Sequence, residues 1–152
     1  MIFMINVFNV AHWFLHKKSL THKQLQKLCY YAQAWHLALL DEKLFDEEIQ
    51  AWVHGPVIPA LYACYADYGW LPIPQEKEEY VQFSEPTIDV LNAVYNTYAQ
   101  FSGEQLESLT HSELPWKEAR GNLAPYEVCT NRISLETMKK YYDEKYKQAQ
   151  GD

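Results

Sequence analysis

The most constraining part of this sequence is the stretch from 49 to 62, which reads IQAWVHGPVIPALY. Every second residue from 49 to 53 is apolar, which matches the period of a short β-strand. Gly55 and Pro56 then interrupt any regular element, because glycine tolerates positive φ and proline has no N–H to donate. Pro59 fits the first turn of a helix. The stretch therefore predicts a largely buried strand, a bend and a helix start, and we expect the other helices to pack around it.

A long helix is predicted just before this stretch. Thr21 and Gln24 have the spacing of a capping box, in which each side chain bonds the backbone N–H of the other residue. Apolar residues cover nearly every side of the segment as far as about Leu40. A helix with this pattern is normally enclosed by the rest of the protein.

The remaining sequence is also mostly helical in pattern. Apolar residues recur at helical spacing in five further segments, and Ser102 with Gln105 forms a second capping-box pattern. A length of 152 residues suits one domain, which we expect to span 1–152. The predicted fold class is mainly α, of the α+β type. It is a compact helical domain with a small antiparallel β element near residues 43–53 and a further candidate strand at 80–83.

Two separate blocks of the chain resemble the signatures of a known family. The run from Leu25 to Tyr62 contains LQKLCYYAQAW, LFDEEIQAW and HGPVIPALY, and the run from Leu109 to Ala119 reads LTHSELPWKEA. Together they resemble the Panacea family, also called SocA-like antitoxin domains and seen in some phage-associated proteins. The segment ISLETMKKYY is similar to the family's closing helix. The resemblance implies that the following residues maintain the fold: Leu25, Lys27, Leu28, Tyr30, Trp35, Trp52, His54, Gly55, Pro56, Val57, Pro59, Tyr62, His111, Pro115 and Trp116.

The resemblance implies an antitoxin that neutralises a cognate protein toxin by direct binding. One branch of the family delivers its toxin to a Clp-type protease, so such a protease is a second candidate partner, and a second copy of the chain is a third. The alternative reading is a phage-associated accessory or host-takeover protein. We expect the partner to contact exposed positions near the signature blocks, with Trp52, His54, Tyr62 and Tyr65 as candidates.

Charge and aromatic content agree with a protein partner. A net charge of −7 argues against binding to a phosphate backbone and suits a basic protein. The chain has twelve Tyr and five Trp, which either fill a tyrosine-rich core or form a partner surface. Trp35, Trp52, Trp70 and Trp116 are spread along the chain, and one or two of them are candidate anchors.

The predicted location is the cytoplasm. Three cysteines at long spacings indicate neither a disulfide framework nor a metal site, which fits a reducing compartment. The apolar start of the chain is short and lacks the basic residues of a secretory signal. No apolar run approaches the ~20 residues that a membrane span requires.

A catalytic function has one candidate group of residues. His54, His111 and Glu113 could act as an acid–base group of a hydrolase if the two signature blocks meet in space. No nucleophile motif accompanies them, however. The favoured interpretation is that His111, Ser112 and Glu113 satisfy free backbone groups where a helix ends before Pro115. The chain is therefore predicted not to be an enzyme.

Two further patterns could bind a cation. His12 and His16 are one helical turn apart, but no third ligand accompanies them. The acidic run 46–48 is more typical of a solvated turn. We therefore expect no metal and no cofactor.

Overall fold

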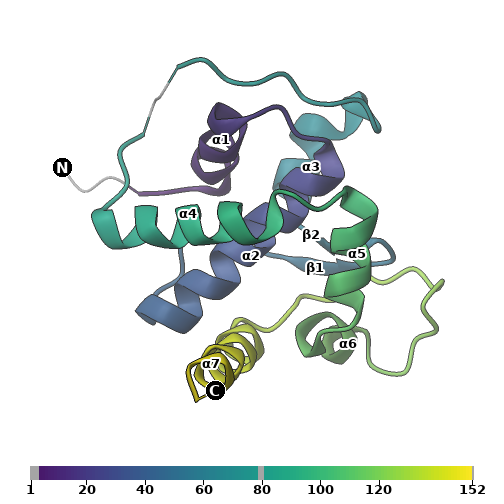
Figure 1. Ribbon diagram of the computed structural model, residues 1–152. Coiled ribbons are helices and arrows are strands. Elements are labelled where there is room, and N and C mark those ends of the chain that lie inside the picture. Colours follow the sequence, from purple (N-terminus) through teal and green to yellow (C-terminus); the bar gives the residue numbers. More distant parts are fainter. Residues whose placement is uncertain (1–3, 79–80, 152) are drawn as a thin grey trace.

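The computed structural model describes residues 4–78 and 81–151 of the chain. It contains seven α-helices, a short 3₁₀ helix and a two-stranded antiparallel sheet in this part of the chain, which confirms the mainly α fold class (Figure 1). The elements are α1 (Val7–Lys17), α2 (His22–Leu40), β1 (Gln50–Trp52), β2 (Gly55–Val57), α3 (Pro59–Tyr65), η1 (Ala66–Tyr68), α4 (Glu85–Tyr98), α5 (Gly103–His111), α6 (Leu114–Arg120) and α7 (Leu135–Gly151).

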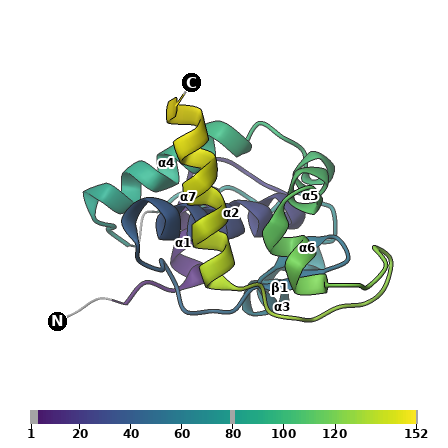
Figure 2. The same ribbon diagram turned by 90° about the horizontal axis from the view of Figure 1, so that it is seen from below.

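The centre of the fold is α2. It contacts α1, α3, α4, α5, α7 and β2, and Figures 1 and 2 show α4 and α7 lying across it. The expectation that the other helices pack around 49–62 is therefore wrong. A helix of nineteen residues that is apolar nearly all round can be covered from every side, whereas the hairpin is short and contacts mainly α2, α5 and α6.

The helix starts follow the capping signals in the sequence. Thr21 with Gln24 and Ser102 with Gln105 form the two predicted capping boxes, and Asn6 with Asn9 forms a third. At its other end α2 stops at Asp41, whose φ of 58° is left-handed. These local hydrogen bonds satisfy the backbone N–H groups that every helix start leaves free.

The β element is a tight hairpin of β1 and β2. Gln50 pairs with Val57 and Trp52 with Gly55 around a two-residue turn. The predicted strand at 49–53 is present, but its partner is 55–57 and not the segment near 43. The reason lies in Gln33 of α2, which accepts the backbone N–H of Leu44 and donates to the carbonyl of Phe45. That side chain binds the backbone of the segment that was expected to form the partner strand.

The outer side of β1 is covered by a segment from much later in the chain. The Ala51 N–H donates to the Asn131 carbonyl at 2.9 Å, and the Ile133 N–H donates to the Ile49 carbonyl at 2.8 Å. The strand predicted at 80–83 is not formed by residues 81–83, and Tyr80 lies outside the described residues. The chain before it lies along α1, where the Glu76 N–H donates to the Leu15 carbonyl.

The aromatic residues divide between the interior and the surface. Tyr30, Tyr31 and Tyr142 are fully buried, whereas Trp70 is 91% exposed.

The free thiols of Cys29 and Cys129 are buried and that of Cys64 is exposed. No helix in the described part of the chain is both long and apolar enough to cross a membrane.

Candidate functional site

The two signature blocks meet at the hairpin. The Trp116 indole donates to the Trp52 carbonyl at 2.8 Å, and the buried Arg120 guanidinium donates to the Ala51 carbonyl at 3.0 Å. Both donors lie on α6, and both acceptors lie on β1. The His111 ring at the end of α5 stacks on Trp116 with ring centroids 3.9 Å apart. The second block therefore holds the hairpin of the first block in place.

Lys27 of α2 is buried beneath the hairpin. Its residue exposure is 1%, and its Nζ donates to the Pro56 carbonyl at 3.3 Å. Gly55 lies against it with φ of 107°, and a Cβ at this glycine would stand 2.7 Å from Lys27 Cε. Position 55 therefore requires glycine for two reasons: its backbone conformation has positive φ, and Lys27 approaches too closely for a Cβ.

The environment of Lys27 disfavours its charged form. Burial, with a smaller effect from the positive charge of Lys23, lowers the pKa of Lys27 to about 7, while Glu107 acts in the opposite direction. An ammonium ion has three N–H donors, and the described part of the chain offers this one a single hydrogen bond. The group is therefore a poorly compensated cation directly under the hairpin.

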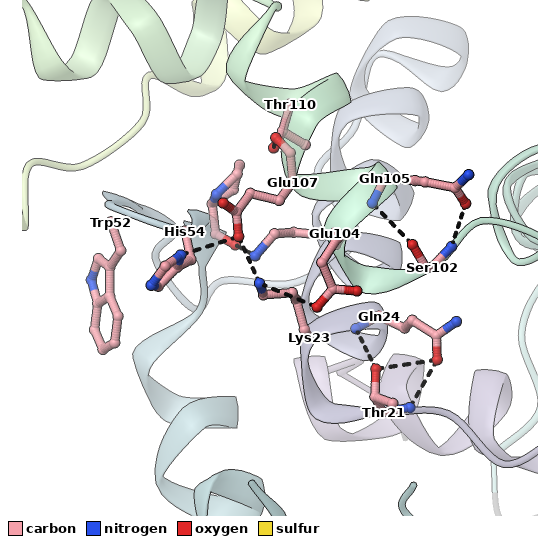
Figure 3. A network of polar contacts seen from close by, with 12 residues as sticks. Thr21, Lys23, Gln24, Trp52, His54, Ser102, Glu104, Gln105, Glu107 and Thr110 are labelled. Carbon is pink, nitrogen blue, oxygen red and sulfur yellow. Dashed lines mark hydrogen bonds and ion pairs between the residues drawn. The ribbon is translucent and has the colours of Figure 1, made fainter. Parts of the chain in front are cut away.

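An ion-pair network lies between α2, α5 and the hairpin turn (Figure 3). Glu107 accepts hydrogen bonds from Lys23 Nζ at 2.7 Å and from His54 Nδ1 at 3.1 Å. Burial alone would raise the pKa of Glu107, but the hydrogen bonds from Lys23 and His54 outweigh it and lower the pKa below its ordinary value. Glu104 lies 3.8 Å from Lys23 and is largely exposed. The network therefore joins two carboxylates to one lysine and one histidine at this edge of the hairpin.

Glu113 is buried one helical turn further along α2, where helices α2, α6 and α7 meet. Its Oε1 accepts hydrogen bonds from the hydroxyls of Tyr31 at 2.7 Å and Tyr142 at 2.9 Å. Its Oε2 accepts from Lys145 Nζ at 3.2 Å. Burial raises the pKa of both tyrosines, and the neighbouring carboxylate raises it further. These phenols stay protonated and hold the carboxylate as donors.

The three residues of the candidate acid–base group have separate partners. His54 is exposed and bonds Glu107, whereas Glu113 is 2% exposed and bonds the two tyrosines. Burial lowers the pKa of His111. The Nε2 of this histidine is buried and has no hydrogen-bond partner among the described residues. The arrangement is therefore not an acid–base constellation.

The favoured structural interpretation is correct in part. Ser112 Oγ donates to the Leu109 carbonyl at 2.6 Å, as expected for a side chain that satisfies a helix end. His111 bonds the backbone of Val53 instead of its own helix. Glu113 bonds phenol hydroxyls and an amine, so its role is to join three helices.

The other candidate ligands bind protein groups. The rings of His12 and His16 bond the carbonyls of Glu78 and Glu76 respectively. In the acidic run, Asp46 pairs with Lys43, Glu48 pairs with Arg132, and Glu47 accepts the N–H of Val7 at the start of α1. No group of three or more potential metal ligands occurs in residues 4–78 and 81–151.

Several functional side chains were missed by the pattern of the sequence. Glu107, Arg120 and Gln26 all bind across elements, and Gln26 bonds both the N–H and the carbonyl of Ile58. The available signal was a polar residue on an otherwise apolar helix, which applies to Gln26 and Gln33 of α2. Glu107 and Arg120 carry no such signal, because both lie on short helices with mixed faces.

Two of the hollows near the signature blocks lie beside the hairpin turn and between α6 and α7. A small apolar pocket of about 270 Å³ lies beside the hairpin turn, lined by Trp52, Val53, His54, Val128, Cys129 and Thr130. A larger open groove of about 740 Å³ runs between α6 and α7. Most of its lining side chains are charged or polar, and Leu114 and Tyr141 also line it. Of the predicted partner-binding residues, Trp52 and His54 line the first pocket, and the Tyr62 ring lies 5.0 Å from the Trp52 ring.

Comparison with known proteins finds a family match over the part of the chain that contains the hairpin, Lys27 and Glu107. Residues 25–117 match the sequence model of a family described as antitoxin SocA-like, Panacea domain. The matched segment includes most of α2, the hairpin, α5 and most of the second signature block, and it confirms the resemblance seen in the sequence. No curated protein and no solved structure matches the chain.

Proposed function

The chain belongs to the SocA-like antitoxin family with the Panacea domain, and from that premise we propose that it neutralises a cognate protein toxin by binding it directly. The observation that carries the proposal is the match over residues 25–117, which covers the first signature block and most of the second. A toxin–antitoxin-related role follows from the family. Neutralisation by direct binding is the step that we add.

The physical mechanism is occlusion of a basic toxin surface. The net charge of −7 favours encounter with a basic partner, because complementary charge mainly increases the association rate. Exposed aromatic side chains then supply the buried contacts that slow dissociation. In this mechanism the protein acts in the cytoplasm and performs no catalytic step.

The test is co-expression with the small protein encoded beside this chain in its genome. Inducing that protein alone should stop growth, and inducing this chain with it should restore growth and yield a co-purifying complex. An unrelated acidic helical protein, expressed at the same level, controls for nonspecific relief. Continued growth arrest with every adjacent small protein would contradict the proposal.

A host lacking its Clp-type proteases separates two modes of neutralisation. If binding alone blocks the toxin, this chain restores growth equally in the mutant host. If the chain delivers its toxin for proteolysis, growth is restored only where the protease is present and the toxin level falls. Immunoblots of the toxin in both hosts distinguish the two modes.

A further inference from the structure

An exposed aromatic surface extends from the hairpin along α3 and η1. The rings of Trp52 and Tyr62 lie 5.0 Å apart, and His22 lies 5.2 Å from Tyr62 and 6.4 Å from Tyr65. Tyr65 and Tyr68 follow at 6.3 Å. Tyr62 and Tyr65 meet through the buried ring of His22, and we call the surface formed by Trp52, Tyr62, Tyr65 and Tyr68 the aromatic face.

The aromatic face contains very little charge. From 55 to 72 the only formally charged residue is Asp67. At its far end Trp70 and Leu71 are both largely exposed, and Tyr62 and Tyr68 are also exposed. Monomeric proteins rarely expose contiguous apolar side chains, because contact of apolar surface with water is unfavourable. A surface of this kind therefore marks an interaction site.

The apolar pocket continues the aromatic face beyond Trp52. Trp52 forms part of both, and Val128, which is 85% exposed, forms the opposite side of the pocket. The volume of about 270 Å³ accommodates one large apolar side chain. A single anchor of this kind, enclosed by near-neutral contacts, is typical of a binding hot spot.

Both sides of the pocket are held in place by hydrogen bonds. The Trp52 indole donates to Gln50 Oε1 at 2.8 Å, and the Trp52 carbonyl accepts from Trp116. The loop that carries Val128 is held by Arg120, whose guanidinium donates to the Ala124, Pro125 and Glu127 carbonyls. A preorganised pocket costs less conformational entropy to fill.

The charged side chains beside this surface are predominantly acidic. Asp67 is exposed in η1, between Tyr65 and Tyr68 in the chain. His54 of the pocket bonds Glu107, with Glu104 on the same helix (Figure 3). Lys23 is the basic residue that contacts both glutamates. Three carboxylates therefore stand against Lys23 and the buried Lys27, and the indole and phenol faces also attract cations.

We infer that the aromatic face and its pocket bind a basic segment of a partner protein. One apolar side chain of that segment enters the pocket beside Trp52, and its Lys or Arg side chains lie against Glu104 and Asp67. The identification of this partner with the toxin rests on the proposed function. The chemistry of the segment follows from the surface alone.

A library of random peptides displayed on phage tests that chemistry without the toxin. Selection against the folded chain should enrich peptides that combine a large apolar residue with Lys or Arg. Val128→Asp, which places a charge in the pocket, should weaken their binding at least tenfold. The matched control Leu114→Asp makes the same kind of change at an exposed position in the α6–α7 groove and should leave binding unchanged. Failure to enrich any peptide, enrichment without basic residues, or equal weakening by both variants would overturn the inference.

The growth assay then links the surface to the toxin. Val128→Asp should lose the rescue that wild type and Leu114→Asp provide. If wild type rescues growth and Val128→Asp rescues equally, the toxin binds elsewhere and the inference fails while the proposed function stands. If the wild type fails to rescue but the selected peptides behave as expected, the proposed function fails and the surface chemistry stands. A dimer by light scattering that Val128→Asp makes monomeric would assign the surface to a second copy of the chain and overturn the inference.

Discussion

Glu113 and Lys27 are both buried ionisable residues, but their surroundings satisfy them very differently. The carboxylate of Glu113 receives hydrogen bonds from two phenols and an amine. The amine of Lys27 has one hydrogen bond, of 3.3 Å, to a backbone carbonyl. Glu113 joins helices in the interior, whereas Lys27 lies beneath the hairpin that carries Trp52.

The comparison shows where this chain gains stability and where it gives some up. A buried charge with good hydrogen bonds is costly to disturb, since removing it leaves its partners unsatisfied. A buried charge with few hydrogen bonds is itself a cost. Native proteins commonly retain such costs beside functional surfaces, and here the poorly satisfied residue is the one nearer the proposed partner surface.

The largest effect is expected from Glu113→Ala. The change leaves the buried hydroxyls of Tyr31 and Tyr142 without their acceptor and removes the partner of Lys145. The free energy of unfolding should fall by roughly 3–5 kcal/mol in urea denaturation. Glu144→Ala, at an exposed position on α7, should change it by less than about 0.5 kcal/mol. A similar small effect for both variants would contradict the structural role of Glu113.

Gly55→Ala should have the next largest effect. The new Cβ meets Lys27 at 2.7 Å and occupies a backbone with φ of 107°, so we expect a loss of roughly 2–4 kcal/mol. Gly69 also has positive φ but faces open space, so Gly69→Ala should cost only about 1 kcal/mol.

A double-mutant cycle separates the clash from the backbone strain at Gly55. Lys27→Ala removes the side chain that the new Cβ meets, so the two changes together should cost less than the sum of each alone. Additive losses within about 0.5 kcal/mol would show that backbone strain alone requires this glycine.

Lys27→Met should stabilise the protein near neutral pH. The folded pKa of about 7 lies below the ordinary value of 10.5, so the folded state binds fewer protons between these values. The unfolding free energy of the wild type therefore rises with pH across that window. The advantage of Lys27→Met should be roughly 1–3 kcal/mol at pH 6 and should shrink towards pH 10. Chemical denaturation at several pH values measures it, and a destabilised variant at pH 6 would show that the amine contributes more than its burial costs.

Glu107→Gln should have the smallest effect. The lowered pKa of Glu107 means that its ionised form stabilises the fold at neutral pH, and this contribution disappears as pH falls through the folded pKa. We expect a loss of about 0.5–1 kcal/mol at pH 7 that decreases in high salt. Thermal melts at pH 7 and pH 3 check this, and an unchanged difference at pH 3 would contradict the assignment.

The sequence predicted the parts of the fold that depend on neighbouring residues. The capping boxes at Thr21 and Ser102 are local, and the enclosed position of α2 follows from apolar residues on all its faces. The sequence left open whether the two distant signature blocks meet, and the contacts of Trp116 and His111 with the hairpin show that they do. The partner of β1 was not predictable from the sequence. The segment near 43 is kept from pairing with β1 by the Gln33 side chain, which binds the backbone of Leu44 eleven residues later.

The candidate site was less predictable than the fold for the same reason. Glu113 bonds Tyr31 across 82 positions and Tyr142 across 29, and no local pattern records such pairings. Lys27 was recognised as a signature residue, but its burial depends on a hairpin that begins more than twenty residues later. Trp52, His54 and Tyr62 were identified as partner candidates because they lie in the signature block and its surroundings.

The cover that residues 131–133 provide for β1 has a consequence for synthesis on the ribosome. The hairpin emerges early, but its outer backbone edge stays unpaired until about eighty further residues have followed. Part of the Trp52 pocket is supplied by the residues just before this cover, Val128, Cys129 and Thr130. A nascent chain therefore completes the proposed partner-binding surface only after residues 128–133 have been made, and earlier association with the partner is disfavoured by the order in which the chain is made.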